Sequence, residues 1–332
     1  MNLIYPATTD NIRLAAGILK SGNLVAMPTE TVYGLAANAL DQKAVAKIFE
    51  SKGRPQSNPL IVHLLNLDHV DRVSLVKSGD LALNRARKLR SFFPGPLTIV
   101  LPANSNLPKN VTAGLDTVAI RFPAHPVARS LLEVSGLPLA APSANRSGYL
   151  SPTTAEHVAG ESLLHIKMIL DGGACKFGVE STVLDLTTTK PQILRAGVVT
   201  LEDLILALGE EIVLLNDDLQ NAAAPRSPGA RFTHYAPHAR VIFYRDLTEE
   251  IVSQYSKIGR IFFEKPLPAE GKKYNYVVDL SGQGGLEYVA RELYGALRQA
   301  DLFGCDLIVV DNCPESGVGL AIMDRLKRAI KR

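Results

Sequence analysis

The amino-acid sequence predicts an α/β protein built from two domains. Short apolar runs alternate with segments of helical apolar spacing along most of the chain, as expected for helices packed on a large twisted sheet. The length of 332 residues exceeds one comfortable domain, and a segment rich in proline and small residues interrupts the alternation at 216–239. We therefore expect a first domain over 1–215 and a smaller α/β domain over 240–332, joined by that segment.

The elements of the first domain follow from apolar spacing and from residues that end helices. Helices are expected over 11–22, 41–53, 78–93 and 125–136, with Asp41 as an N-cap and with Gly22 and Gly53 as C-caps. Apolar runs predict strands over 23–28, 58–65, 97–102, 117–123, 168–173 and 181–187, and a strand entering a loop over 137–145. The segment 27–40 then lies at the exit of the first strand.

The second domain repeats the alternation on a smaller scale. Strands are expected over 240–245, 260–264, 274–281 and 305–311, and helices over 247–259, 285–304 and 317–330. The joining segment contains three prolines but also a set of side chains that a passive spacer does not need, namely Arg226, Arg231, Phe232, His234 and Tyr235.

Bulk properties narrow the class of protein. At 46% hydrophobic and 21% charged residues the chain is ordinary for a globular protein, and it has neither an 18-residue apolar run nor the start of a signal peptide. Three cysteines without metal spacing indicate reduced thiols and a cytoplasmic location. Basic residues outnumber acidic ones by 20 to 14 through Thr200 but are outnumbered 16 to 19 beyond it. A mildly basic first part fits an anionic ligand and equally fits a solvated surface.

No compact catalytic motif is present, so chemistry must come from separated loops. The loop 28–34 places Thr29, Glu30 and Thr31 at a strand exit. The loop 51–63 sets Lys52 and Arg54 beside Gly and Pro. Two fixed cations suit a polyphosphate, but they would equally complement the dipole of the helix end that precedes them.

Two further loops, at 141–153 and 172–186, are rich in small polar residues. Hydroxyls and amides after an apolar run can bind phosphate or ribose, and they are also common turn formers. Arg121 interrupts an apolar strand, and Arg195 follows another. A charge inside a strand needs a ligand or an ion-pair partner, and Glu30 and Glu180 are the candidate partners for Arg121.

Taken together, these loops resemble the blocks of one family, in that family's order. They read "PTETVYGLAANA", "KGRPQSNPLIVH", "FFPGPLTIVL", "VAIRFPAHP", "APSANRSGYLSPT", "GVESTVLDL", "ILRAGVVT" and "SPGARFTHYAP", and the helix "GVGLAIMDRLKRA" follows them. The chain resembles the YrdC-like threonylcarbamoyl-AMP synthases in their two-domain form, over nearly its whole length. Ala36 and Ala196 stand where the family more often has Gly and Pro, and neither is an expected ligand.

The resemblance implies a fold and a reaction. The fold is a YrdC-like twisted mixed sheet with a concave basic cleft, plus a smaller Rossmann-like C-terminal domain. The reaction joins L-threonine, bicarbonate and ATP into threonylcarbamoyl-AMP and pyrophosphate. A transferase complex then modifies the adenosine beside the anticodon of tRNA. Magnesium would accompany ATP on phosphates and water, with no metal ligand from the protein.

The resemblance also implies site residues. The expected L-threonine pocket consists of Thr31, His63, Arg121, Ala141 and Ser181. The expected ATP side consists of Lys52, Arg54, Asn58, Thr117, Ser143, Asn145, Ser151, Arg195 and Tyr235. Lys52 and Arg54 would act electrostatically, without a covalent nucleophile, and Cys175 would be a packing residue. The joining segment 216–239 would close over the cleft as a lid, anchored by the small domain.

Three alternatives remain beside this hypothesis. A basic cleft could bind structured RNA without catalysis, although aromatic residues are only 6% of the chain, and weak RNA binding could also coexist with the enzyme activity. Hydrogenase-maturation carbamoyltransferases share the YrdC-like domain, but they carry zinc-finger regions that the few cysteines here do not match. The small domain could serve only as a lid support or a docking surface.

Overall fold

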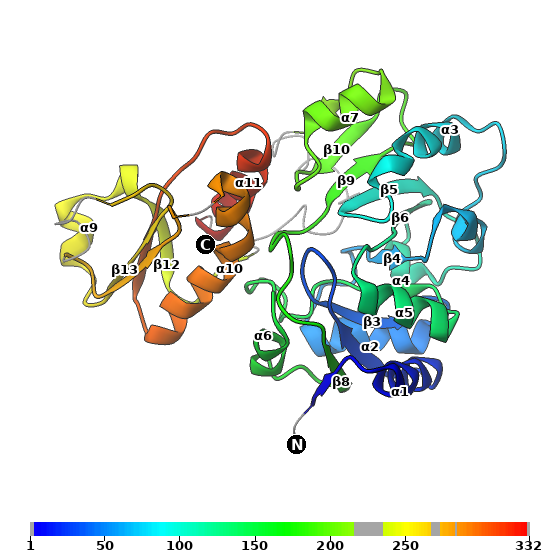
Figure 1. The fold of residues 1–332 in the computed structure, drawn as a ribbon, viewed down its shortest axis with the longest axis horizontal. Coiled ribbons are helices and arrows are strands. Elements are labelled where there is room, and N and C mark those ends of the chain that lie inside the picture. Colours follow the sequence, from blue (N-terminus) through cyan, green and yellow to red (C-terminus); the bar gives the residue numbers. More distant parts are fainter. Residues whose placement is uncertain (1–2, 216–234, 267–272, 283, 331–332) are drawn as a thin grey trace.

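The computed structural model describes residues 3–215, 235–266, 273–282 and 284–330. It confirms the α/β class, with a large mixed sheet in the first part and a smaller parallel sheet in the second. Figure 1 shows the two bodies side by side, with the last two helices of the chain between the small sheet and the large domain.

Eleven of the described strands form the large sheet. In spatial order these are β1 (Ile4–Pro6), β8 (Ile166–Asp171), β2 (Leu24–Met27), β3 (Gly34–Asn38), β7 (Leu139–Ala140), β4 (Ile61–His63), β6 (Thr117–Arg121), β5 (Leu97–Pro102), β9 (Thr182–Asp185), β10 (Gln192–Arg195) and β11 (Val213–Leu214). Parallel and antiparallel neighbours alternate irregularly. The order brings segments far apart in sequence to neighbouring positions.

Helices cover both faces of this sheet. They are α1 (Thr9–Lys20), α2 (Gln42–Lys52), α3 (Leu81–Lys88), α4 (Lys109–Thr112), α5 (Pro126–Ser135), α6 (Ala155–Gly160) and α7 (Leu201–Leu208), with 3-10 turns η1 (Leu67–Arg72) and η2 (Leu89–Phe92). Asp41 caps α2 as expected, since its carboxylate accepts from the backbone N–H of Lys43 and Ala44, and Gly53 ends the helix with φ 60°.

Several expectations about elements differ from the structure. The helix expected over 247–259 is helical only over Glu249–Ser253, and its last residues begin the strand Ile258–Phe262. The segment 34–38, for which no element was expected, forms strand β3 and pairs antiparallel with β2. Its sequence, GLAAN, lacks β-branched residues, so no local pattern indicated a strand. The helix expected over 78–93 begins only at Leu81 and changes to a 3-10 turn at Leu89. The short β1 was also not anticipated.

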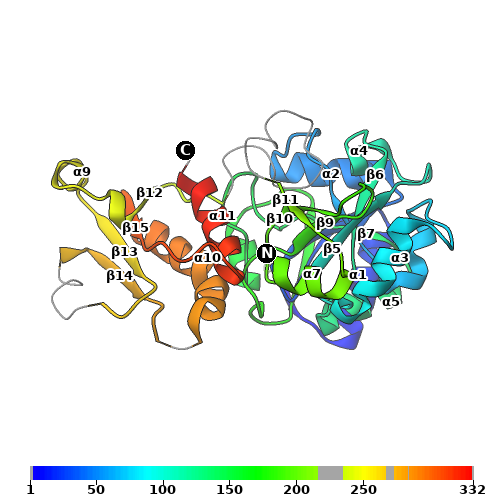
Figure 2. The ribbon, with the colours of Figure 1, turned by 90° about the horizontal axis from the view of Figure 1, so that it is seen from above.

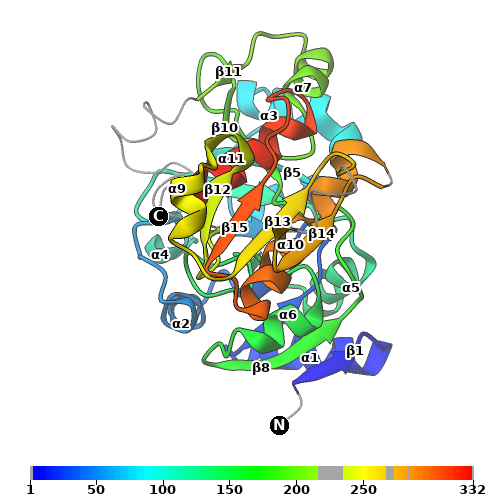
Figure 3. The ribbon, with the colours of Figure 1, turned by 90° about the vertical axis from the view of Figure 1, so that its left-hand side faces the viewer.

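The small domain has a four-stranded parallel sheet in the order β12 (Arg240–Phe243), β15 (Leu307–Val310), β13 (Ile258–Phe262) and β14 (Tyr276–Asp279). Its helices are α9 (Glu249–Ser253), α10 (Gly285–Phe303) and α11 (Val318–Ile330), with the 3-10 turn η3 (Tyr244–Asp246). Figures 2 and 3 show α10 and α11 on the face of the sheet that is turned toward the large domain. These two helices therefore lie between the small sheet and the first domain.

Within the described ranges, no helix is both long enough and apolar enough to cross a bilayer. The cytoplasmic location stays a prediction.

Candidate functional site

A buried cavity of about 50 Å³ lies among the loops that the sequence singled out. Its walls come from the exits of β2, β4, β6, β7 and β10 and from the segment before β9. The lining residues are Thr31, Val32, Arg54, Ile61, His63, Arg121, Ala141, Pro142, Ser143, Glu180, Ser181, Arg195 and Tyr235. This volume holds a few water molecules.

Arg121 ends β6 next to His63, which ends the parallel strand β4. Its Nη2 donates to Glu30 Oε1 at 2.8 Å, its Nη1 to Thr31 Oγ1 at 2.7 Å, and its Nε to the Gly95 carbonyl at 3.4 Å. The ion pair with Glu30 that the sequence left open is therefore present. These bonds use three of the five guanidinium N–H groups, and the other two have no hydrogen-bond partner among the described residues.

Glu30 fixes the orientation of this arginine. Its second oxygen accepts from the backbone N–H groups of Ala124 and His125 at 3.0 and 3.3 Å. Burial alone would raise the pKa of Glu30, but the charge and hydrogen bond of Arg121 hold that pKa below its ordinary value. The pair is therefore ionised at neutral pH, and the guanidinium has a defined direction.

His63 brings an unsatisfied polar atom to the cavity. The residue is 2% exposed, and its Nδ1 has no hydrogen-bond partner among the described residues. Burial, followed by the nearby charge of Arg121, lowers the pKa of His63 to about 3. The imidazole is therefore neutral at physiological pH. A buried orphan nitrogen in a cavity wall is a feature that a bound ligand would satisfy.

Ser181 and Arg195 form the opposite part of the wall. The Ser181 hydroxyl lies 2.7 Å from Thr98 Oγ1, and Arg195 donates to the carbonyl and the hydroxyl of Ser181, both at 3.1 Å. Gly197 permits the close approach of this strand end, because a Cβ there would lie 2.3 Å from the backbone nitrogen of Thr182. The sequence motif "ILRAG" thus places a buried guanidinium at the cavity.

Arg54 supplies a third cation at the cavity. It is 8% exposed, and it donates to the carbonyls of Asn58 and Pro59 at 3.2 and 2.9 Å. Burial lowers the pKa of Arg54 to about 10, so it still carries its charge at neutral pH. Asn58 lies beside it with a buried side-chain oxygen that has no partner among the described residues.

Lys52, which was expected near the phosphates, contacts the loop that carries Ser143. Its ammonium donates to the carbonyls of Ser143, at 2.5 Å, and of Asn145, and it is not among the described residues that line the cavity. Burial, followed by the charge of Arg54, lowers the pKa of Lys52 to about 7. The geometry therefore makes Lys52 a support of the loop that carries Ser143, with no direct exposure to the cavity.

The expected site residues therefore separate into two groups. Nine of them line the cavity, namely Thr31, Arg54, His63, Arg121, Ala141, Ser143, Ser181, Arg195 and Tyr235. The others do not line it, namely Lys52, Asn58, Thr117, Asn145 and Ser151. Thr117 begins β6, at the opposite end of that strand from Arg121. Tyr235 is the first described residue of the joining segment; the lid expected over the preceding part, 216–234, lies outside the described residues.

Sequence reasoning missed the cluster around Glu180. This carboxylate lines the cavity, and it accepts from Ser151 Oγ at 2.5 Å, from Tyr294 Oη at 3.0 Å and from Arg325 Nε at 2.8 Å. The last two side chains come from α10 and α11 of the small domain. An arginine on the apolar face of the closing helix was the one available indication, because such a residue needs a buried acid.

A metal centre and a reactive thiol are both absent from the described part of the chain. No group of three His, Cys, Asp or Glu side chains with metal-binding geometry occurs there. Cys175 is buried, and burial raises the pKa of its thiol to about 12, so it fits the packing role expected from the sequence.

Two family models match the chain. One, for the Sua5, YciO and YrdC proteins and described as "Telomere recombination", matches residues 17–197. The other, described as the threonylcarbamoyl-AMP synthase C-terminal domain, matches residues 199–330.

Similar proteins agree with these models. The threonylcarbamoyl-AMP synthase of Pyrococcus abyssi is 42% identical, covering 96% of this chain and 93% of that protein, and the one of Bacillus subtilis is 43% identical, covering 96% and 92%. A putative threonylcarbamoyl-AMP synthase of Mycobacterium tuberculosis matches only 60% of this chain but 90% of its own length, at 38% identity.

Among solved structures, Pyrococcus abyssi Sua5 complexed with L-threonine superimposes with a TM-score of 0.88 at 40% identity, covering 100% of this chain and 97% of that one. The similarity therefore extends over both domains and over the loops that surround the cavity. The chain belongs to the Sua5, YciO and YrdC family, in the two-domain form that carries the threonylcarbamoyl-AMP synthase C-terminal domain.

Proposed function

We propose that this chain is a nucleotidyltransferase that makes threonylcarbamoyl-AMP and pyrophosphate from L-threonine, bicarbonate and ATP. The observation that carries the proposal is the cavity itself. It combines an oriented, ionised arginine, an unsatisfied neutral histidine and two further buried arginines. The names of the similar enzymes, and the L-threonine bound to Pyrococcus abyssi Sua5, support the choice of substrates.

The amino acid would bind at the Arg121 side of the cavity. The two remaining guanidinium N–H groups offer a fork for the threonine carboxylate, and Glu30 keeps that fork in place. His63 Nδ1 and the hydroxyl of Thr31 could satisfy polar groups of the substrate. Ala141 and Ser181 would complete this pocket.

ATP would bind at the side formed by Arg54, Ser143, Arg195 and Tyr235. Asn58, Asn145 and Ser151 lie in the segments that carry these residues, and Thr117 stays a more distant candidate. Lys52 would act through the loop that it supports.

The reaction follows from this placement. The threonine amine joins bicarbonate to form a carbamate, with loss of water. A carbamate oxygen then forms a bond to the α-phosphorus, and the bond from that phosphorus to the bridging oxygen breaks, so that pyrophosphate leaves. Arg54 and Arg195 would stabilise negative charge on the phosphoryl and leaving oxygens. No covalent intermediate with the protein is needed.

Magnesium would enter with ATP. The described residues offer no acidic cage, and Mg²⁺ readily takes phosphate and water oxygens as ligands. When bound, it would neutralise phosphate charge. The side chains of the cavity would perform the proposed roles without any of them binding the metal.

The product is a mixed anhydride, which fits transfer to an acceptor rather than accumulation. We propose that a transferase complex acting on the adenosine beside the anticodon of tRNA consumes it in the cytoplasm. RNA itself is not needed for the adenylating step, and weak RNA binding stays a secondary prediction.

Pyrophosphate release tests the proposal. Purified protein is incubated with Mg-ATP, with L-threonine and bicarbonate supplied singly, together or not at all. Pyrophosphate release that depends on both L-threonine and bicarbonate would support the proposed reaction. Release without threonine would contradict the substrate assignment. No release from folded protein, together with strong RNA binding that weakens steeply with salt, would favour the RNA-binding alternative.

A further inference from the structure

The small domain reaches the cavity through two buried side chains. Arg325 is 1% exposed, and its Nε lies 2.8 Å from Glu180 Oε2. Its Nη1 donates to the carbonyl of Ala196 at 2.9 Å, directly after Arg195. The Tyr294 hydroxyl is 3.0 Å from the same Glu180 oxygen. Donors from α10 and α11 therefore hold a carboxylate that lines the cavity.

The same carboxylate connects to the loop on the proposed nucleotide side. Ser151 Oγ donates to Glu180 Oε1 at 2.5 Å. With its proton directed at the carboxylate, this hydroxyl can only accept from a ligand. Glu180 thus fixes the hydroxyl of Ser151, which is fully buried beside the cavity without lining it.

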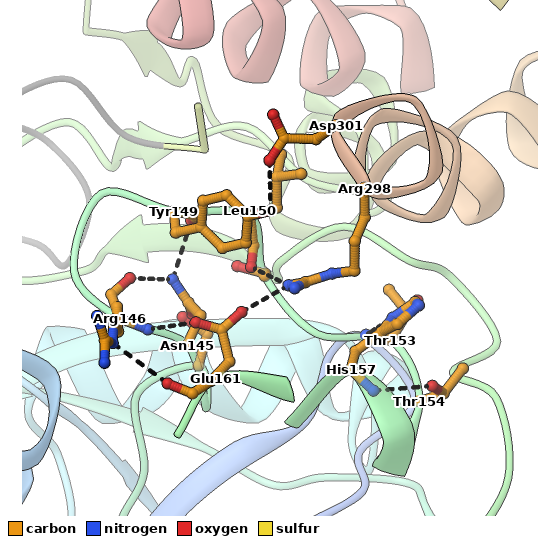
Figure 4. A network of polar contacts seen from close by, with 12 residues as sticks. Asn145, Arg146, Tyr149, Leu150, Thr153, Thr154, His157, Glu161, Arg298 and Asp301 are labelled. Carbon is orange, nitrogen blue, oxygen red and sulfur yellow. Dashed lines mark hydrogen bonds and ion pairs between the residues drawn. The ribbon is translucent and has the colours of Figure 1, made fainter. Parts of the chain in front are cut away.

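A second contact from α10 holds the residues just before Ser151. Figure 4 shows Arg298 extending from α10, with Nη2 at 2.8 Å from Glu161 Oε1 and at 2.9 Å from the Leu150 carbonyl. The Tyr149 hydroxyl donates to Asp301 at 2.7 Å. The loop 149–151 is therefore fixed to the small domain at successive residues.

The domains also approach closely at the backbone. Gly178 has φ +71°, and a Cβ there would lie 2.2 Å from the carbonyl oxygen of Arg291 in α10. The segment that leads to Glu180 therefore packs directly on this helix. A contact of this closeness ties the position of the carboxylate to the position of the small domain.

The Mycobacterium tuberculosis relative matches 60% of this chain over 90% of its own length, so that relative has no counterpart to a large part of this chain. We propose that Arg325, assisted by Tyr294, is a positioning residue that holds Glu180, and through it Ser151 and the Arg195 strand end, for reaction with ATP. This inference rests on the proposed function. It makes the small domain part of the site in this chain and more than a lid support.

The pH dependence of catalysis provides a further measurement, because it reports on the protonation of Glu180. Burial alone would raise the pKa of Glu180, but the charges of Arg325 and Arg195 and the Ser151 hydrogen bond keep the pKa below its ordinary value. Loss of Arg325 therefore raises it, and Glu180 takes up a proton at a higher pH. The groups facing this carboxylate cluster are Arg325 and Asp324 of α11, Tyr294 of α10, Arg195 of β10, Ser151 and Tyr235.

The test compares Arg325→Gln and Arg325→Lys with Arg260→Gln. Arg260 is a matched control, because it is a buried arginine of the same domain, 2% exposed, whose acid partner Asp311 is remote from the cavity lining. Steady-state pyrophosphate release gives kcat and KM for each substrate between pH 5 and 8. Hydrogen exchange of 149–151 and 179–182 reports positioning without any turnover.

We expect Arg325→Gln to lower kcat/KM for ATP by about tenfold or more, with the threonine KM within about twofold of wild type. The acid limb of the pH profile of kcat/KM should move to higher pH in this variant. Hydrogen exchange of the segments 149–151 and 179–182 should become faster. Arg325→Lys should restore part of each effect, because it returns the charge. Arg260→Gln should leave these readouts unchanged. Should Arg325→Gln fail to fold, Tyr294→Phe removes one donor only and should show the same pattern, smaller.

Wild-type kinetics and exchange in both Arg325→Gln and Tyr294→Phe would overturn the inference, as would equal losses in Arg260→Gln. A wild-type protein that releases no pyrophosphate would instead contradict the proposed function. The exchange comparison would still decide whether Arg325 positions the loop.

Discussion

Arg121→Lys tests the role given to the guanidinium fork. Lysine keeps a positive charge beside Glu30, so the buried carboxylate is not left without a partner, but a single ammonium cannot reproduce the three existing bonds and also grip a carboxylate in two places. A hydrogen bond to a charged group contributes about 1.5–3 kcal/mol. Loss of one such bond to the threonine carboxylate corresponds to roughly 10- to 150-fold in affinity.

The assay is pyrophosphate release with L-threonine titrated at saturating ATP, and then with ATP titrated at saturating threonine. We expect the threonine KM to rise by about the factor given above and the ATP KM to stay within about threefold. Arg85→Lys is the control, because Arg85 is also a buried arginine of the first domain and pairs with Glu210 away from the cavity. An unchanged threonine KM with a raised ATP KM would refute the assignment of Arg121 to the amino acid.

Three further predictions follow from buried groups. The pKa of His63 is lowered to about 3, so between about pH 6.5 and 3 the unfolded chain binds a proton at this residue that the folded protein does not bind. His63 therefore lowers the free energy of unfolding as the pH falls through that window. Urea unfolding at pH 7 and pH 5 should show a smaller loss of stability for His63→Gln than for wild type. Gly178→Ala should lower the unfolding free energy by at least about 1–2 kcal/mol through its left-handed backbone and its contact with α10, whereas the control Gly173→Ala, also at positive φ but with no atom within 4 Å of the added Cβ, should cost less; equal costs in denaturant titrations would argue against the domain contact. Finally, Cys175 should resist thiol reagents in the folded protein, because burial raises its pKa to about 12, and rapid labelling with loss of turnover would show an exposed thiolate instead.

The sequence predicted the parts of the fold that local pattern controls. Asp41 and Gly53 mark the ends of α2 because capping is decided by residues a few positions apart. Strand β3 was missed because Gly and Ala carry no strand preference, and its existence depends on pairing with β2 and β7. Strand order likewise depends on contacts that one sequence does not display.

The candidate site also combines features that local sequence predicts with features that depend on contacts between distant segments. Arg121 could be identified because a charge in an apolar strand demands an explanation, although only the structure shows that it pairs with Glu30 and keeps two N–H groups that no described residue uses. The contacts of Lys52 with the carbonyls of Ser143 and Asn145 could not be predicted, because they depend on where those carbonyls lie in space. The pairing of Glu180 with Arg325 joins residues 145 positions apart, and no local pattern contains it.

The most direct test of the account is to identify the product. Wild-type protein is incubated with ATP, L-threonine and ¹³C-bicarbonate, and the nucleotides are analysed at once by mass spectrometry. The account predicts a threonylcarbamoyl adenylate that carries the label and that is lost when threonine is omitted. AMP and pyrophosphate without any labelled adenylate, or a labelled product formed without threonine, would contradict the claim that this cavity joins the amino acid, bicarbonate and the nucleotide.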